Sequence, residues 1–286
     1  MMPPFNPSSK FGVDNIYPSS FLFDPSRMIT STHNPKIKLI RALQGRPKER
    51  RETGAFLAEG IRLVEEAQAA NWPFRFVLYD ELLNERGSLL VENLMSRGVE
   101  CEMVSSSVMK SISETESPQG VLAALNEFHI PIPDSLNFIL IPDKIRDPGN
   151  LGTLLRTAAA AGVQAVLLPP ETTDAFAPKV VRSGMGAHFR MLIHSMSWDE
   201  INQTVNLAGL HVFLADMDGQ SCWETDLCQP LALIIGSEAE GASESAKQLA
   251  NQIISVPMSG GVESLNAGVA GSVLMLEVVR QRWENI

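Results

Sequence analysis

Apolar residues occur along this chain as short runs that alternate with segments of helical periodicity, most clearly after residue 137. Short apolar runs bounded by turn residues predict buried strands, and apolar positions three and four residues apart predict amphipathic helices. The expected strands are 138–141, 165–168, 191–193, 211–215, 231–235 and 253–256. The expected helices are 151–161, 177–183, 198–206, 243–250 and 265–283. This alternation predicts an α/β domain over 137–286, with a parallel sheet and helices on both faces.

The preceding part of the chain shows a second, smaller alternation. Strands are expected at 55–59, 74–79, 99–104 and 121–126. Helices are expected at 36–43, 61–70, 89–97 and 108–112, with a loop at Gly45 and Pro47. Residues 33–128 therefore predict a compact α/β unit of ordinary domain size. A proline-containing stretch, 129–136, is expected to be the linker. Residues 1–32 are rich in Pro, Ser and Asn, without a sustained period, and predict an extended or disordered arm.

Composition limits the class of protein. The chain has 286 residues, of which 44% are hydrophobic, and no apolar run reaches the ~18 residues that span a bilayer. The first 26 residues contain one basic residue, Lys10, and no apolar core, which argues against a secretory or transit peptide. The three cysteines lack disulfide or metal-ligand spacing. We therefore expect a reduced, cytoplasmic protein with no membrane segment and no metal.

Charge changes the picture locally. The net charge of −10 would discourage a nucleic-acid partner, but residues 36–51 carry a concentrated basic stretch with one acid, Glu49. Its basic residues are Lys36, Lys38, Arg41, Arg46, Lys48, Arg50 and Arg51. Such a run is compatible with phosphate contacts. Taken alone, it is more typical of a solvated helix face.

The first candidate functional segment begins where an expected strand ends near Pro142 and a helix follows. A Pro148-Gly149 turn leads to Asn150, a residue suited to cap the helix, and Arg156 lies within two turns beyond it. The alternative is a capping asparagine followed by an arginine that faces solvent.

Two further segments end apolar strands with polar or small residues. The run 231–235 leads into Gly236, with Glu238 two residues later. The run 253–256 stops at Pro257, and a polar cluster then opens a helix whose first turns are unusually small. Glycine inside a helix costs about 1 kcal/mol relative to alanine, so Gly268 and Gly271 indicate close approach of a ligand or another backbone. Tight helix packing is the alternative.

Together these segments resemble the SpoU (TrmH-like) branch of the SPOUT superfamily, the RNA ribose 2′-O-methyltransferases. The first motif of the family, Asn-x-Gly-x-x-x-Arg-Thr, is matched by Asn150, Gly152, Arg156 and Thr157. The second, Gly-x-Glu-x-x-Gly, is matched by Gly236, Glu238 and Gly241. The third is matched by Val256, Pro257, Met258, Ser264, Leu265 and Asn266. Residues 33–128 resemble the family's substrate-binding domain, a ribosomal-protein-like (L30e-like) α/β fold. Ala267-Gly268 and Ser183-Gly184 depart from the common pattern without removing a reacting group.

The resemblance implies a deep trefoil knot in the domain 137–286, with S-adenosyl-L-methionine bound in it. Gly236, Val256, Met258 and Leu265 would surround the adenosine. The catalytic group would comprise Asn150, Arg156, Glu238, Ser264 and Asn266. Asn150 would place the target ribose, and Glu238, Ser264 and Asn266 would hold the arginine and the methionyl part of the cofactor.

The implied reaction is in-line transfer of a methyl group to a ribose 2′-oxygen. In that family, the counterpart of Arg156 is proposed to act as the general base. An arginine stays protonated at neutral pH and is therefore a poor base. We therefore expect Arg156 to clamp phosphate and hydroxyl and to stabilise developing oxyanion charge.

The resemblance further implies a homodimer through the knot domain and RNA docking on residues 36–51. Ribosomal RNA is favoured over transfer RNA as the substrate. Two other hypotheses remain: a non-catalytic RNA-binding ribosome-assembly factor on the same fold, and a nucleotide-dependent oxidoreductase. The second lacks the Gly-x-Gly-x-x-Gly fingerprint after any strand.

Overall fold

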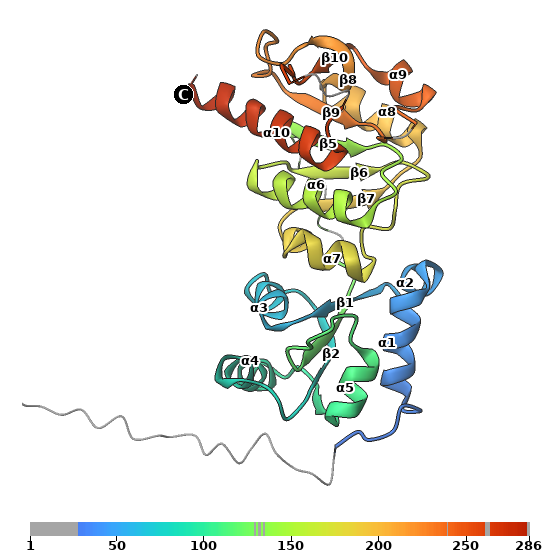
Figure 1. The fold of residues 1–286 in the computed structure, drawn as a ribbon, viewed down its shortest axis with the longest axis vertical. Coiled ribbons are helices and arrows are strands. Elements are labelled where there is room, and N and C mark those ends of the chain that lie inside the picture. The colour runs from blue at the N-terminus through green and yellow to red at the C-terminus, as the bar shows by residue number, and fades with distance from the viewer. Residues whose placement is uncertain are drawn as a thin grey trace, which may run out of the picture.

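The computed structural model describes residues 28–128, 130, 133, 135–238, 240–260 and 264–284. Most of the expected arm, residues 1–27, and part of the expected linker lie outside the described residues. Two sheets are present, one of four strands and one of six. Figure 1 shows the four-stranded unit and the six-stranded unit stacked along the long axis of the molecule.

The first unit is a mixed sheet between two pairs of helices. Its elements are α1 (Pro35–Gly45), α2 (Pro47–Thr53), β1 (Ala55–Glu59), α3 (Ile61–Ala69), β2 (Phe74–Tyr79), α4 (Glu85–Ser96), β3 (Cys101–Met103), α5 (Ser106–Ile112) and β4 (Val121–Asn126). The strand order is β1-β4-β2-β3, in which β4 is antiparallel to both of its neighbours. Apolar residues of α1 and α5 pack on one face, and those of α3 and α4 pack on the other.

The second unit is a six-stranded sheet. Its elements are β5 (Phe138–Pro142), α6 (Pro148–Ala160), β6 (Ala165–Leu168), α7 (Pro178–Gly184), the 3₁₀ turn η2 (Ala187–Phe189), β7 (Leu192–Ser195), α8 (Trp198–Leu207), β8 (His211–Ser221), β9 (Leu231–Ile235), α9 (Glu244–Leu249), β10 (Gln252–Ser255) and α10 (Ala267–Glu284). The strand order is β10-β8-β9-β5-β6-β7, and every pair is parallel. Helices α6 and α10 cover one face, and α8 and α9 cover the other. The predicted α/β class with a parallel sheet is therefore confirmed.

Three local expectations were wrong. Helix α6 begins at Pro148, and its N-cap is Asp147, whose Oδ1 accepts a hydrogen bond from the backbone N–H of Asn150 at 2.8 Å. Asn150 thus lies inside the first turn, and its amide is available for other contacts. The loop expected after Gly45 contains α2, a polar helix without an apolar face. Strand β8 continues past Ala215 to Ser221 because it pairs again with β10 after a register shift.

The glycines of the last third are explained by close chain approaches. A Cβ on Gly271 of α10 would lie 2.4 Å from Leu154 Cδ2 of α6, and one on Gly268 would lie 3.4 Å from Asn150 Cα. A Cβ on Gly219 would lie 2.6 Å from the backbone N and C of Ile254. These glycines let α10 pack against α6 and let β8 lie close to β10 at the register shift between them.

The two units share an extensive interface. Phe56 of β1 packs against Phe176 and Phe189, with ring centroids 5.0 and 6.3 Å away. Ion pairs join Arg50 to Asp174 at 2.7 Å, Arg182 to Glu114 at 3.7 Å, and Arg190 to Glu66. Buried aromatic rings and charge pairs of this kind hold the two units in one arrangement. Within the described chain, no helix is long and apolar enough to cross a membrane.

Candidate functional site

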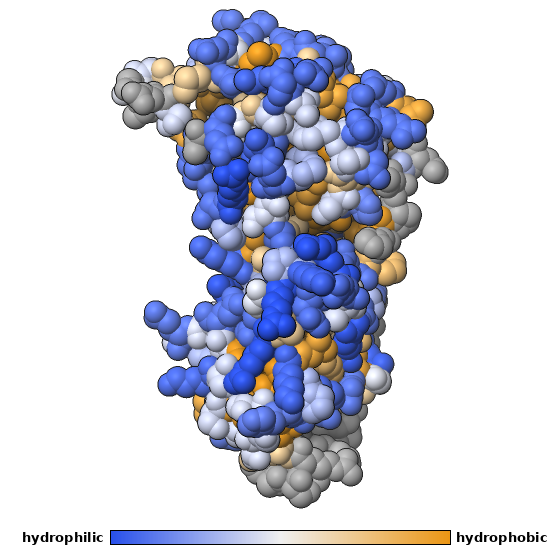
Figure 2. Space-filling view, turned by 90° about the vertical axis from the view of Figure 1, so that its right-hand side faces the viewer, coloured by the Kyte–Doolittle hydropathy of each residue, from blue (hydrophilic) through white to orange (hydrophobic). Residues whose placement is uncertain are grey.

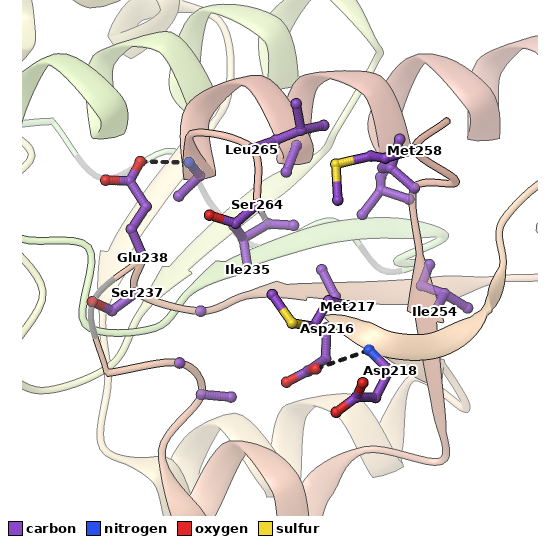
Figure 3. Close-up of a pocket in the computed structure, with 18 residues that line it drawn as sticks. Asp216, Met217, Asp218, Ile235, Ser237, Glu238, Ile254, Met258, Ser264 and Leu265 are labelled. Carbon is purple, nitrogen blue, oxygen red and sulfur yellow. Dashed lines mark hydrogen bonds between the residues drawn. The ribbon is translucent and has the colours of Figure 1, made fainter. Parts of the chain in front are cut away.

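A cavity of about 370 Å³ opens beside residues 215–218 in the middle of β8 and at the carboxyl ends of β9 and β10. In open parallel sheets, ligands bind at this edge. Side chains of Ile235, Ile254, Val256 and Leu274 supply apolar wall, and Gly236 lies at the end of β9. Figure 3 shows Glu238 at one end of the cavity and Met258 at the other. All four residues expected to bind adenosine, Gly236, Val256, Met258 and Leu265, line this cavity.

The polar end of the cavity is a hydrogen-bonded group from three distant segments. Glu238 Oε1 accepts from Asn150 Nδ2 at 2.9 Å and from the backbone N–H of Ala267 at 2.5 Å. Asn150 Oδ1 accepts from Asn266 Nδ2 at 2.9 Å. Asn266 in turn caps α10, because its Oδ1 accepts from the N–H of Val269 at 3.1 Å. The three motifs therefore meet at the first turns of α6 and α10.

Arg156 and Ser264 complete the expected catalytic set. Ser264 lines the cavity and is exposed. Arg156 lies on α6 beyond Asn150 and is also exposed. No residue in the described part of the chain makes a hydrogen bond or ion pair with Arg156. Glu238 and Asn266 are bonded to Asn150 rather than to the guanidinium, which leaves the guanidinium available for a ligand.

The segment 216–218 lines the cavity although it was not among the expected site residues. Asp216 and Asp218 contribute carboxylates, and the Asp216 side chain accepts from the N–H of Asp218 at 3.2 Å. Met217, 60% exposed, lies between them in sequence at the same rim. An Asp-Met-Asp-Gly sequence at a strand's carboxyl end was the available signal, but it belongs to none of the three motifs.

The cavity fits S-adenosylmethionine in shape and charge. Apolar walls and the exposed backbone at Gly236 suit an adenosine moiety. The carboxylates of Asp216, Asp218 and Glu238 suit a ligand that carries a sulfonium and an ammonium. When bound, this cofactor supplies an activated methyl group.

The basic stretch divides into structural and available cations. The Lys36 ammonium pairs with Glu100 at 2.8 Å and Glu102 at 3.0 Å. Arg50, 5% exposed, pairs with Asp174 and donates to the carbonyl groups of Leu43 and Gln44. The other five basic residues are less constrained: Lys38, Arg41, Arg46, Lys48 and Arg51. Among the residues that the structure describes, Arg41 donates to the Ser111 hydroxyl, and Lys48 pairs with exposed Glu52.

Family comparisons match both units of the chain. Residues 137–276 match the SpoU rRNA Methylase family, and residues 34–123 match the MRM3-like substrate binding domain.

Curated relatives extend over nearly the whole chain. A Synechocystis protein named as an uncharacterized tRNA/rRNA methyltransferase is 34% identical over 89% of this chain and 94% of its own length. The 23S rRNA (guanosine(2553)-2′-O)-methyltransferase of Bacillus subtilis is 32% identical over 87% of this chain and 98% of its own.

A solved structure shares the complete fold with this chain. The AdoMet-bound rRNA methyltransferase from Sinorhizobium meliloti superposes with a TM-score of 0.79. It is 30% identical, and the match covers 88% of this chain and 97% of that one.

Proposed function

The chain belongs to the SpoU rRNA Methylase family and is an S-adenosylmethionine-dependent RNA 2′-O-methyltransferase, and we propose that its substrate is ribosomal RNA. One observation carries the assignment of the site: side chains of the three motifs converge at the polar end of an adenosine-sized cavity. The proposed division follows the two sheets, with substrate binding in 33–128, a linker at 129–136 and methyl transfer in 137–286. Relatives bear the names of ribosomal RNA methyltransferases, some of them mitochondrial. For this chain we propose action in the cytoplasm.

In the proposed reaction a 2′-O–CH₃ bond forms, the S–CH₃ bond breaks, and the hydroxyl proton is lost to a phosphate or to solvent. Arg156, exposed and unpaired in the described chain, binds the neighbouring RNA phosphate and stabilises negative charge as it develops on the 2′-oxygen. Asn150, held by Glu238 and Asn266, positions the ribose. Ser264, which lines the cavity, would hold the methionyl part of the cofactor.

The role of Arg156 is tested by Arg156→Ala. We expect methylation of unmodified ribosomal RNA to be lost, while the Kd for S-adenosylmethionine changes by no more than a few-fold. Folding should be unaffected, because the Arg156 guanidinium makes no hydrogen bond or ion pair with the described residues. Tritiated methyl transfer and calorimetric titration of the cofactor measure the two effects. Lys179→Ala, which removes an exposed cation from neighbouring α7, is the control. Retained turnover in Arg156→Ala would refute the role.

We further propose that α10 forms a homodimer interface and that the domain 137–286 contains a trefoil knot. Three exposed apolar residues of α10 are seven positions apart and so share one side of the helix: Val269, Leu276 and Trp283. An apolar stripe on an exposed helix face supports burial against a second copy.

The dimer proposal is tested by Leu276→Asp. A charge at the centre of the stripe should give a monomer by light scattering and strongly reduce methylation. Leu207→Asp on α8 is the matched control, because Leu207 is also exposed but lies on a helix of the opposite sheet face. A dimer that persists in Leu276→Asp would contradict the proposal.

A further inference from the structure

A second cavity, of about 740 Å³, lies between the two units at the carboxyl ends of β6 and β7. The first unit contributes α2 and Glu127, and the second contributes the segments that follow β6 and β7. The lining residues lie within 47–51, at 127, within 168–176 and within 193–197. We call this cavity the interdomain groove. Its volume is at the upper part of the ~300–1,000 Å³ range of ligand clefts.

The interdomain groove and the cofactor cavity lie on one edge of one sheet. In the strand order β10-β8-β9-β5-β6-β7, β6 is separated from β9 only by β5. Neighbouring strands lie about 4.8 Å apart, so the two sites are separated by roughly 10 Å at the level of the strands. A chain of a few nucleotides can extend over that distance. Lys144 and Arg146 follow β5, and both pair with Glu171 of the groove and with Glu240, which follows β9.

Charges in the groove are nearly balanced. Two cations, Arg50 and Arg51, face three carboxylates, Glu127, Glu171 and Asp174. Asp174 is neutralised by Arg50, and Glu171 contacts Arg146 at 3.3 Å. In the described chain, Arg51 and Glu127 have no partner for their charges. A groove with this balance suits nucleosides with a phosphate beside Arg51, and it does not suit the dense phosphates of a duplex.

The groove wall offers both hydroxyls and apolar surface. The Thr173 and Ser195 hydroxyls have no hydrogen-bond partner in the described chain and can bind ribose or phosphate oxygens. Pro169, Phe176 and Met196 provide surface on which a base can pack. Figure 2 shows strongly hydrophilic side chains gathered over the junction of the two units on the face that contains α2.

We propose that the interdomain groove binds the unpaired RNA strand adjacent to the nucleotide being methylated. The proposal rests on the proposed function, because a ribose that reaches a protein cavity must leave its helical stack, which leaves neighbouring nucleotides unpaired. The groove receives those nucleotides along the sheet edge. Arg51 contacts a phosphate, and the rim cation Arg46 extends the path toward α1.

The first experiment uses photocrosslinking. A large-subunit ribosomal RNA transcript containing 4-thiouridine is bound to the full-length protein in the presence of S-adenosylhomocysteine and irradiated. We expect crosslinked peptides from residues 168–176 or 193–197. If the complex forms but crosslinks appear only in other peptides, the proposal is wrong. The same result is expected if the groove binds a protein instead of RNA.

The second experiment fills the groove with Ser195→Trp. We expect the KM for RNA to rise at least tenfold, with kcat and the Kd for S-adenosylmethionine unchanged. Ser96→Trp, an exposed serine on α4, is the matched control. An unchanged KM in a folded Ser195→Trp enzyme would overturn the proposal. A wild-type enzyme that methylates no ribosomal RNA would instead contradict the proposed function.

The third experiment covers the case in which Ser195→Trp does not fold. Arg51→Ala should lower the slope of log affinity against log salt concentration by about 0.7, the value for one phosphate contact to a single strand. Lys110→Ala on α5 removes an exposed cation outside the groove and should leave the slope unchanged. Equal slopes for Arg51→Ala and the wild type would overturn the proposal.

Discussion

Glu238 joins three parts of the chain through one carboxylate oxygen. That oxygen accepts hydrogen bonds from Asn150 on α6 and from the first residue of α10, Ala267. Bonds from a carboxylate to a helix N-terminus also interact favourably with the helix dipole. Glu238 therefore stabilises the site as well as lining it, and its two roles can be separated by substitution.

Glu238→Ala should destabilise the fold by about 1–3 kcal/mol, because the Ala267 N–H and the Asn150 amide lose their acceptor. Glu238→Gln keeps an acceptor oxygen and should cost much less, while lowering methylation because the negative charge beside the cofactor is removed. Urea unfolding and methyl-transfer rates measure the two effects. Equal stability of the two variants would show that the hydrogen bonds contribute little.

At the scale of elements, the close approach of β8 to β10 at their register shift depends on a residue without a side chain. Gly219 passes within van der Waals contact of Ile254, and its carbonyl accepts from the Ser255 hydroxyl at 2.8 Å. Backbone atoms, unlike the ends of side chains, cannot move aside without breaking strand pairing. Asp216, Met217 and Asp218, which line the cofactor cavity, lie in the part of β8 that this register shift leaves unpaired with β10.

Gly219→Ala should destabilise the protein by about 1–3 kcal/mol through overpacking and should weaken S-adenosylmethionine binding, because the strands at the cavity must separate. Thermal unfolding and cofactor titration are the measurements. Gly260→Ala is the control, since a Cβ there would have no atom within 4 Å. If Gly219→Ala has the same unfolding midpoint and the same Kd for S-adenosylmethionine as the wild type, this account of Gly219 is wrong.

At the scale of the whole molecule, His188 lies in the interface between the two units. Its Nε2 lies 2.7 Å from the Ala175 carbonyl oxygen and donates to it, and its ring packs near Phe56 and Phe176. Burial lowers the pKa of His188 to about 4, although the Ala175 carbonyl and Asp174 oppose the shift. The folded protein therefore holds this side chain neutral in the range where an unfolded chain protonates it.

The free energy of unfolding should be independent of His188 protonation above pH ~6.5. It should fall as the pH drops from 6.5 toward 4, because only the unfolded state gains a proton in this range. The loss should be about 2 kcal/mol at pH 5. His188→Phe should show a smaller decrease between pH 7.5 and pH 5 in urea unfolding, even though its stability at neutral pH is lower. Parallel curves for the variant and the wild type would exclude His188 as the source.

Most secondary structure was predictable because hydrophobic periodicity is a local property. The apolar runs 231–235 and 253–256 and the amphipathic segments between strands required no knowledge of their neighbours, although the second run is a strand in which only Ile254 is buried. The exceptions have polar sequences: α2 lacks an apolar face, and the end of β8 becomes a strand by pairing with β10. The start of α6 was misplaced by three residues because Asp147 and Asn150 are both good N-caps, and only the backbone geometry distinguishes them.

By itself, the amino-acid sequence determined the α/β class, the two units and, through its motifs, the family and four residues that line the cavity. Tertiary structure alone decided the order of strands along the sheet edge, which brings the interdomain groove next to the cofactor cavity. It also decided that Lys36 and Arg50 serve ion pairs within the chain, whereas Arg156 remains available. The physical reason is that periodicity depends on neighbours along the chain. The partner of a charge depends on which distant segments folding brings within a few ångströms of it.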